Sequence, residues 1–96
     1  MLLLAKFKIA GHSMEPQIKT GDTVLVSRVP YWFKIPKIND IVAFKDNNGK
    51  ILIKRIVRIQ NRKYFVQGDN RNDSLDSRRF GYISKKQIIG EFIYKL

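Results

Sequence analysis

Residues 40–59 read DIVAFKDNNGKILIKRIVRI, and this stretch predicts a pair of antiparallel strands. Short runs rich in Ile, Val and Phe are typical of β-strands. The DNNG segment between the two runs is a strong hairpin signal, because Asp, Asn and Gly adopt turn conformations readily. The second run carries Lys54 between apolar neighbours. The stretch therefore predicts a fold built from strands and poses a question about this lysine.

The same pattern recurs along the chain of 96 residues, a length that fits a single domain. It predicts an all-β fold, a small and partly closed antiparallel barrel of about six strands. A short helical turn capped by Ser84 is expected at Ser84–Ile89. Two loops stand out, the aromatic Pro30–Lys37 and the polar Gly68–Gly81. The expected strands are Leu4–Ile9, Thr23–Ser27, Ile41–Lys45, Lys50–Gln60, Lys63–Gln67 and Gly90–Tyr94.

The composition is strongly basic, with 19 Lys and Arg against 8 Asp and Glu and a formal net charge of +11. Such a charge predicts attraction to an anionic partner, either nucleic acid or an acidic lipid surface. The chain has no cysteine, which excludes a disulfide framework and a cysteine-based metal site. A single histidine leaves too few ligands for a zinc site of the usual kind. No metal and no cofactor are expected.

Two segments raise the question of a membrane. The opening MLLLA is far shorter than the roughly 18 to 20 apolar residues of a spanning helix, and it lacks the features of a signal peptide. Residues 1–5 therefore either begin a strand or end a membrane helix whose upstream part is not in this chain. In the loop PYWFKIPK, Trp32 and one neighbour either pack on the core or form an exposed aromatic and basic patch suited to a membrane interface.

The segment GHSMEPQIKTGDTVLV, residues 11–26, contains a candidate nucleophile, Ser13. Its neighbour His12 is a poor base for it, because successive side chains of a strand point to opposite faces. A neutral lysine can activate a serine instead, provided that apolar surroundings lower the lysine pKa from about 10.4 toward 7 or 8. Lys54 shares a strand face with two apolar residues. It is either such a base or a surface lysine that snorkels to solvent.

Four blocks follow one another along the chain: GHSMEPQIKTGDTVLV, NDIVAFK, ILIKRIV and GDNRNDSLDSRRFG. In order and spacing they resemble the successive motif blocks of the type I signal peptidase family, over most of Gly11–Gly81. The resemblance implies a membrane-bound serine endopeptidase with a Ser–Lys dyad on an all-β fold. It further implies that the enzyme cleaves signal peptides from exported preproteins, with its active site on the extracytoplasmic face of the membrane.

The resemblance also implies roles for individual residues. Ser13 corresponds to the nucleophile and Lys54 to the general base. Ser74 corresponds to the serine that orients the lysine ammonium through a hydrogen bond. Asp76 and Arg78 correspond to an ion pair that supports the site from beneath. Asp69 corresponds to a further acidic partner for Arg78.

On the substrate side, the family binds its substrate as an extended strand with small residues at the first and third positions before the cut. Met14 is expected to line the pocket, with Ile9 and Gly11 beside the substrate. The segment Leu4–Ala10 is either a free edge for strand addition or a strand paired within the barrel. The backbone N–H of Ser13 is the expected first oxyanion donor. Some members carry a serine where this chain has Gly11, so the second donor is unassigned.

The chain departs from the family pattern because it shows no membrane anchor and no large domain inserted after the lysine strand. Only a short turn around Asn61 and Arg62 stands at that place, which favours a minimal catalytic core. The expected partners are preproteins and an anionic membrane surface, with no nucleic acid. One alternative is a related Ser–Lys maturation protease or a self-cleaving domain like those of LexA-type repressors. Another is a non-catalytic basic barrel that binds single-stranded nucleic acid.

Overall fold

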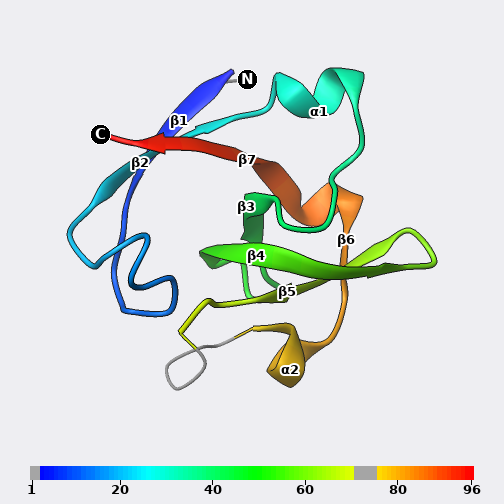
Figure 1. The fold of residues 1–96 in the computed structure, drawn as a ribbon. Helices are drawn as coiled ribbons and strands as arrows, with labels where there is room; N and C mark the ends of the chain where they lie inside the picture. Colours follow the sequence, from blue (N-terminus) through cyan, green and yellow to red (C-terminus); the bar gives the residue numbers. More distant parts are fainter. Residues whose placement is uncertain (1–2, 71–75) are drawn as a thin grey trace.

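The computed structural model describes residues 3–70 and 76–96, which form one curled antiparallel sheet (Figure 1). The strand order is β1-β2-β7-β3-β4-β5-β6, so the first strand of the chain lies at one edge of the sheet. Three short helical segments connect the strands: α1 (Pro30–Phe33), α2 (Ser77–Phe80) and η1 (Lys85–Gln87). The strands are β1 (Leu4–Lys8), β2 (Thr23–Ser27), β3 (Ile41–Lys45), β4 (Ile51–Gln60), β5 (Lys63–Gln67), β6 (Ile83–Ser84) and β7 (Ile88–Lys95).

The all-β expectation is confirmed, and β2, β3 and β5 have the predicted bounds. The main differences lie near the C-terminus. The two-residue strand β6 was not predicted, because a segment that short carries no periodic signal. Strand β7 begins at Ile88 rather than at Gly90, and the predicted helical turn shrinks to η1. The capping box between Ser84 and Gln87 closes one turn only, after which the chain is already extended.

The β3–β4 hairpin turns where the DNNG signal places it. Asp46 organises this turn, because its Oδ1 accepts hydrogen bonds from the backbone N–H groups of Asn48 and Lys50, each at 2.9 Å. Gly49 has a φ of 82°, which is the left-handed region that glycine occupies at no steric cost. The turn fixes the register in which Val42 lies opposite Lys54.

The curl of the sheet buries both faces of β3. Ile41 and Ala43 pack in a first core cluster, while Val42 and Phe44 pack in a second one. Burial on both sides explains why IVAF is a continuous apolar run rather than an alternating one. The first core cluster consists of Met14, Ile18, Val24, Val26, Ile41, Ala43 and Ile53, and the second of Val42, Phe44, Ile56, Tyr64, Val66 and Ile83.

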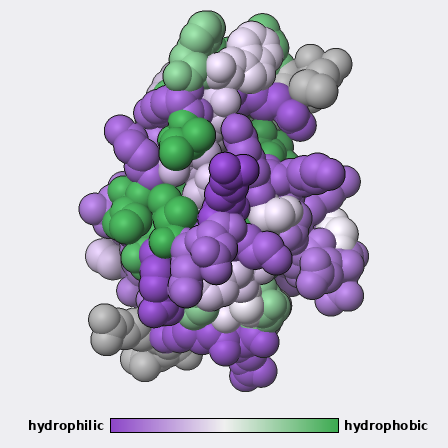
Figure 2. All heavy atoms as spheres, turned by 90° about the vertical axis from the view of Figure 1, so that its right-hand side faces the viewer, coloured by the Kyte–Doolittle hydropathy of each residue, from purple (hydrophilic) through white to green (hydrophobic). Residues whose placement is uncertain are grey.

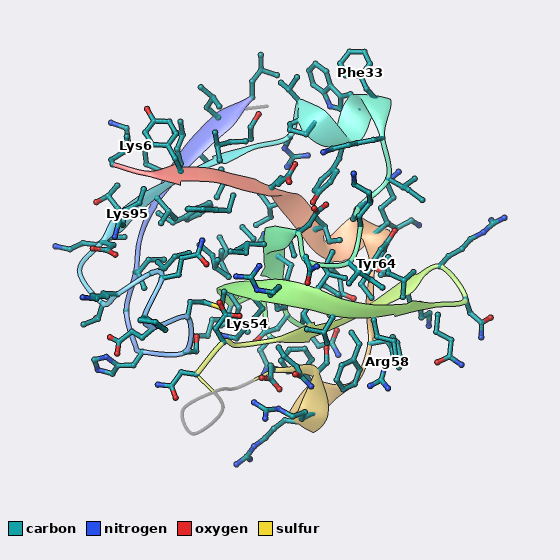
Figure 3. The ribbon with its side chains drawn as sticks, viewed as in Figure 1. Lys6, Phe33, Lys54, Arg58, Tyr64 and Lys95 are labelled. Carbon is teal, nitrogen blue, oxygen red and sulfur yellow. The ribbon has the colours of Figure 1, made fainter. Side chains whose placement is uncertain are left out.

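The aromatic loop divides its side chains between core and solvent. Tyr31 packs against the second core cluster and donates its hydroxyl to Asp40 Oδ2 at 2.8 Å. Burial and this hydrogen bond to a carboxylate both raise the pKa of Tyr31. Trp32 is 57% exposed. Phe33, which projects from α1 (Figure 3), is 84% exposed. The exposed patch is therefore the better of the two interpretations for these two residues, since Tyr31 alone of the three aromatics packs inward.

The N-terminal segment is extended from Leu4, so Leu4 and Ala5 lie in β1. Strand β1 pairs with β2 in register from Leu4 opposite Ser27 to Lys8 opposite Thr23. In residues 3–70 and 76–96, no helix has the length and apolar character needed to cross a membrane.

Candidate active site

Ser13 lies in the turn that follows β1, and buried neighbours hold that turn in place. Met14 is buried in the first core cluster, as is Ile18, whose N–H donates to the Met14 carbonyl at 3.0 Å. The Ser13 carbonyl accepts a hydrogen bond of 2.7 Å from the N–H of Asn70, which follows β5. A residue at the start of the polar loop Gly68–Gly81 therefore fixes the backbone of the candidate nucleophile.

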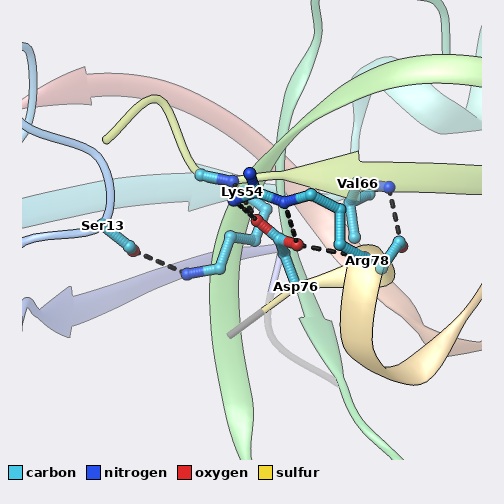
Figure 4. Close-up of polar contacts among 7 residues, drawn as sticks. Ser13, Lys54, Val66, Asp76 and Arg78 are labelled. Atoms are coloured by element: carbon cyan, nitrogen blue, oxygen red, sulfur yellow. Dashed lines mark hydrogen bonds and ion pairs between the residues drawn. The ribbon is translucent and has the colours of Figure 1, made fainter. Parts of the chain in front are cut away.

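Lys54 extends from β4 toward this turn. Lys54 is only 4% exposed, and its Nζ lies 2.6 Å from Oγ of Ser13 (Figure 4). The two residues are 41 positions apart in the sequence. Ser13 offers Lys54 a hydroxyl, which orients an amine without favouring its charged form as a carboxylate would. The structure thus brings the two expected dyad residues together.

His12, in contrast, is exposed and is engaged elsewhere. Its Nδ1 lies 2.6 Å from Oε2 of Glu15, one turn further along the chain. The carbonyl of His12 accepts a hydrogen bond from the side-chain amide of Asn70 at 3.1 Å. This placement agrees with the expectation that His12 is a poor base for Ser13.

Asp76 and Arg78 form the expected ion pair at the start of α2. Asp76 is fully buried, and its carboxylate accepts hydrogen bonds from Nε and Nη2 of Arg78 at 3.0 and 2.8 Å (Figure 4). It also accepts from the backbone N–H of Gly68 at 3.0 Å and caps α2 through the N–H of Arg78. This pairing raises the pKa of Arg78. Asp76 therefore ties α2 to the end of β5.

Ser77 anchors the same segment to the sheet. Its buried hydroxyl oxygen accepts a hydrogen bond of 2.8 Å from the N–H of Val66 in β5 (Figure 4). Ser74, the residue expected to orient the lysine, lies outside the described residues.

Asp69 has a different partner from the expected one. Both of its carboxylate oxygens accept hydrogen bonds of 2.9 Å from Arg55, in a two-pronged ion pair, and not from Arg78. The reason is the register of the sheet. Arg55 lies opposite Gln67 at the end of β5, so its guanidinium is beside the residues that follow that strand. The hydrogen bond to Asp69 raises the pKa of Arg55.

Arg55 also joins two other segments, which sequence reasoning missed. It donates to Oε1 of Gln17 at 3.0 Å and to the carbonyl of Asn39 at 3.1 Å. Gln17 lies in the block that carries the nucleophile, and Arg55 directly follows Lys54 in the chain. The only sequence signal for this network was the position of these residues within the motif blocks.

A groove of about 220 Å³ runs beside the Ser13–Lys54 pair. Both residues line it, together with Met14 and Ile9, as expected for the substrate side. Gly11 is not among its lining residues; its φ of 98° instead lets the chain turn after β1. The other lining residues are Phe7, Lys8, Ala10, Lys50, Ile51, Leu52 and Ile53.

Two strand edges border this groove. Within the described sheet, β1 is hydrogen-bonded to β2 alone, so its other edge is available for pairing. Pairing between β4 and β5 begins only at Arg55, so the segment 51–54 of β4 pairs with β3 but not with β5. Such edges present backbone N–H and C=O groups to an extended peptide. In the described part of the chain, no group of three or more His, Asp or Glu side chains is placed to hold a metal ion.

Similarity to known proteins extends over almost the whole chain. The chain matches the family described as "Signal peptidase, peptidase S26" over residues 1–59 and 57–96. It is 28% identical to "Signal peptidase I V" of Bacillus subtilis, over 88% of this chain and 80% of that protein. It is 25% identical to "Probable signal peptidase I-1" of Synechocystis, over 99% of this chain and 75% of that protein.

A plant relative is matched over a smaller part of its length. The chain is 26% identical to "Thylakoidal processing peptidase 1, chloroplastic" of Arabidopsis thaliana, over 91% of this chain but only 40% of that protein. The two segments of the family match meet at residues 57–59, within β4 and just before the hairpin at Asn61 and Arg62. That is the place where sequence analysis found no inserted domain.

Proposed function

The chain belongs to the signal peptidase family, peptidase S26, and is therefore a serine endopeptidase of the signal-peptide-processing type; within that activity, we propose that Ser13 is the nucleophile and Lys54 its general base. The observation that carries this assignment is the 2.6 Å contact between Nζ of Lys54 and Oγ of Ser13. Burial of Lys54 supports it further, because a dry environment favours the neutral form of an amine.

In the proposed reaction, the neutral Lys54 amine accepts the proton of the Ser13 hydroxyl as Oγ attacks the scissile carbonyl carbon. The resulting ammonium then gives that proton to the departing amine of the mature protein. A water molecule hydrolyses the acyl-enzyme ester, again with Lys54 as the base. The backbone N–H of Ser13 is the proposed donor to the oxyanion.

The proposed substrate is the segment of a preprotein that precedes the cut, bound as an extended strand in the groove between β1 and the segment 51–54. Main-chain hydrogen bonds to these two edges would hold the substrate in register. Side chains that point into the groove meet the apolar wall formed by Phe7, Ile9 and Met14. A groove of about 220 Å³ that holds the catalytic pair as well leaves room for small side chains.

We further propose that the enzyme works at an anionic membrane surface, with its active site on the extracytoplasmic side. The net charge of +11 supplies long-range attraction to anionic lipid. The exposed Trp32 and Phe33 supply apolar and aromatic contacts of the kind found at membrane interfaces.

Cleavage of a generic preprotein, scored for a cut after a small residue, tests the assignment. Ser13→Ala and Lys54→Ala should each abolish cleavage while the circular dichroism spectrum stays that of the unchanged protein. His12→Ala is the matched control, because it removes the other candidate base beside Ser13 and should leave the rate within about twofold. Full activity of the Ser13 or Lys54 variant would rule out the dyad.

A further inference from the structure

A second cavity, of about 150 Å³, lies away from the active site and beside α1. Its lining residues come from the segment leading into α1, from α1 itself, from η1 and from the start of β7. The volume is below the roughly 300 to 1,000 Å³ of pockets that enclose drug-sized molecules. A group the size of a phosphate fits it better than a whole metabolite does. The lining residues are Arg28, Tyr31, Trp32, Pro36, Lys85, Ile88 and Ile89.

Two cations, Arg28 and Lys85, border this cavity. Neither Arg28 nor Lys85 forms an ion pair with any carboxylate in the described part of the chain. The nearby carboxylates are engaged elsewhere: Glu91 lies 3.6 Å from Lys34, and Asp40 accepts from the Tyr31 hydroxyl. Two cations at one small cavity favour an anionic ligand, and a planar guanidinium suits phosphate oxygens well.

Apolar side chains surround the same end of the molecule. The N–H of Arg28 donates to the Leu3 carbonyl at 3.1 Å, which places the start of β1 next to the segment that leads into α1. Leu3, Leu4, Trp32 and Phe33 are all exposed there. Figure 2 shows apolar side chains at the top of the molecule, the end that carries α1 in Figure 1. A cationic cavity within an apolar rim is suited to a headgroup at a membrane interface, and not to a free anion in water.

We propose that this cavity binds the phosphate headgroup of an anionic phospholipid through Arg28 and Lys85, with Trp32 packed at its rim. The proposal rests on the membrane location proposed above and gives it a defined contact. It also orients the enzyme. The α1 end would face the lipid, and β1 would run from that end toward Ser13, along the edge proposed to hold the substrate (Figure 1).

Vesicle binding by the whole chain gives the first test. Trp32 is the only tryptophan, so fluorescence emission reports on this site alone. Vesicles of phosphatidylcholine with phosphatidylglycerol should co-sediment with the protein and shift its emission to the blue, whereas phosphatidylcholine alone should do neither. Inorganic phosphate at the same phosphorus concentration should leave the emission unchanged. An equal shift with inorganic phosphate would assign the cavity to a free anion and overturn the lipid proposal.

A matched pair of double variants isolates the cavity from overall charge. Arg28→Gln with Lys85→Gln removes one arginine and one lysine from the cavity, while Arg62→Gln with Lys86→Gln removes one of each outside it. The cavity variant should bind the mixed vesicles about thirtyfold more weakly, and the control no more than about fivefold. Equal losses in the two variants would show that net charge alone matters and would refute the site.

Two further variants keep the test decisive. Lys85 is exposed, so Lys85→Gln alone should fold normally and still weaken vesicle binding about fivefold. Unchanged binding by this variant would count against the proposed site. Ser13→Ala should lose cleavage but bind vesicles like the unchanged protein. Cleavage by Ser13→Ala would refute the catalytic assignment and leave the vesicle result standing, so the two failures are distinguishable.

Discussion

Two regions of this molecule reverse the usual distribution of side chains. Lysine side chains are normally solvated, yet Lys54 is only 4% exposed in the interior of the curled sheet. Phenylalanine side chains are normally buried, yet Phe33 is 84% exposed at α1 (Figure 3). Buried charged residues and exposed large apolar residues are the informative exceptions in a folded domain. The first calls for a chemical role, and the second calls for a partner surface.

The two regions are also assembled differently. The surroundings of Lys54 are joined by contacts between distant segments, such as the 2.7 Å hydrogen bond from Asn70 to Ser13 and the ion pair of Arg55 with Asp69. The exposed aromatics, in contrast, come from one continuous turn, which follows Pro30. Activity should therefore be sensitive to remote substitutions, while the aromatic patch should respond mainly to changes within its own loop.

The largest effect is expected from Lys54→Met, which replaces the buried lysine by an apolar side chain of similar length. Removing the proposed general base should lower kcat by about a thousandfold. Stability should rise by about 1 kcal/mol, because methionine needs neither a proton nor a hydrogen bond in a dry site. Single-turnover cleavage and thermal unfolding measure the two effects. Lys45→Met, at an exposed lysine of β3, is the control, and a fall in the stability of the Lys54 variant would contradict the burial argument.

The next effect is expected at Asp76, which holds α2 against the end of β5. Asp76→Ala leaves the N–H groups of Gly68 and Arg78 and the Arg78 guanidinium without their acceptor. The free energy of unfolding in urea should fall by about 3 kcal/mol. Arg78→Gln should cost less, because the arginine side chain is 37% exposed and water can replace it in part. A larger fall in the free energy of unfolding for Arg78→Gln than for Asp76→Ala would contradict the central role given to Asp76.

A smaller effect is expected at Asp69, which pairs with Arg55 and which we propose acts through it as a positioning residue. Asp69→Ala removes both acceptors of the Arg55 fork and should destabilise the fold by about 1 to 2 kcal/mol. It should lower kcat about tenfold with little change in KM, because the turn carrying Ser13 loses a connection through Gln17. Arg55→Lys keeps the positive charge but loses the two-pronged hydrogen bonding to Asp69. It should therefore also lower kcat with little change in KM. A change confined to KM would place Asp69 on the substrate side instead.

The smallest effect on the stability of the fold is expected at Phe33, in the exposed aromatic loop. Phe33→Ser should change the free energy of unfolding by less than about 0.5 kcal/mol, because the ring packs against little. It should nevertheless weaken binding to phosphatidylglycerol vesicles about tenfold. Tyr94→Ser, at an exposed aromatic of β7, is the matched control and should leave vesicle binding unchanged. Equal losses would show that exposed aromatics contribute regardless of their place.

Much of the fold was predictable because strands leave a local signal. The runs at β2, β3 and β5 are bounded by turn residues, and their ends were predicted without error. Strand β6 was missed because two residues carry no period. The partner of Asp69 was also missed. The resemblance to the family implied Arg78, but the register of β4 and β5 places the guanidinium of Arg55 beside Asp69.

By itself, the sequence determined the strand content, the turn at Asp46, the basic charge and, through its motif blocks, the family and the candidate pair. Only the tertiary structure decided whether Lys54 is buried or snorkels to solvent, and which side of the aromatic loop faces water. The physical reason is that alternation along a strand sets the face of a side chain, which is a local property. Burial depends on what packs over that face, and for Lys54 this is a turn carrying Ser13, 41 residues away.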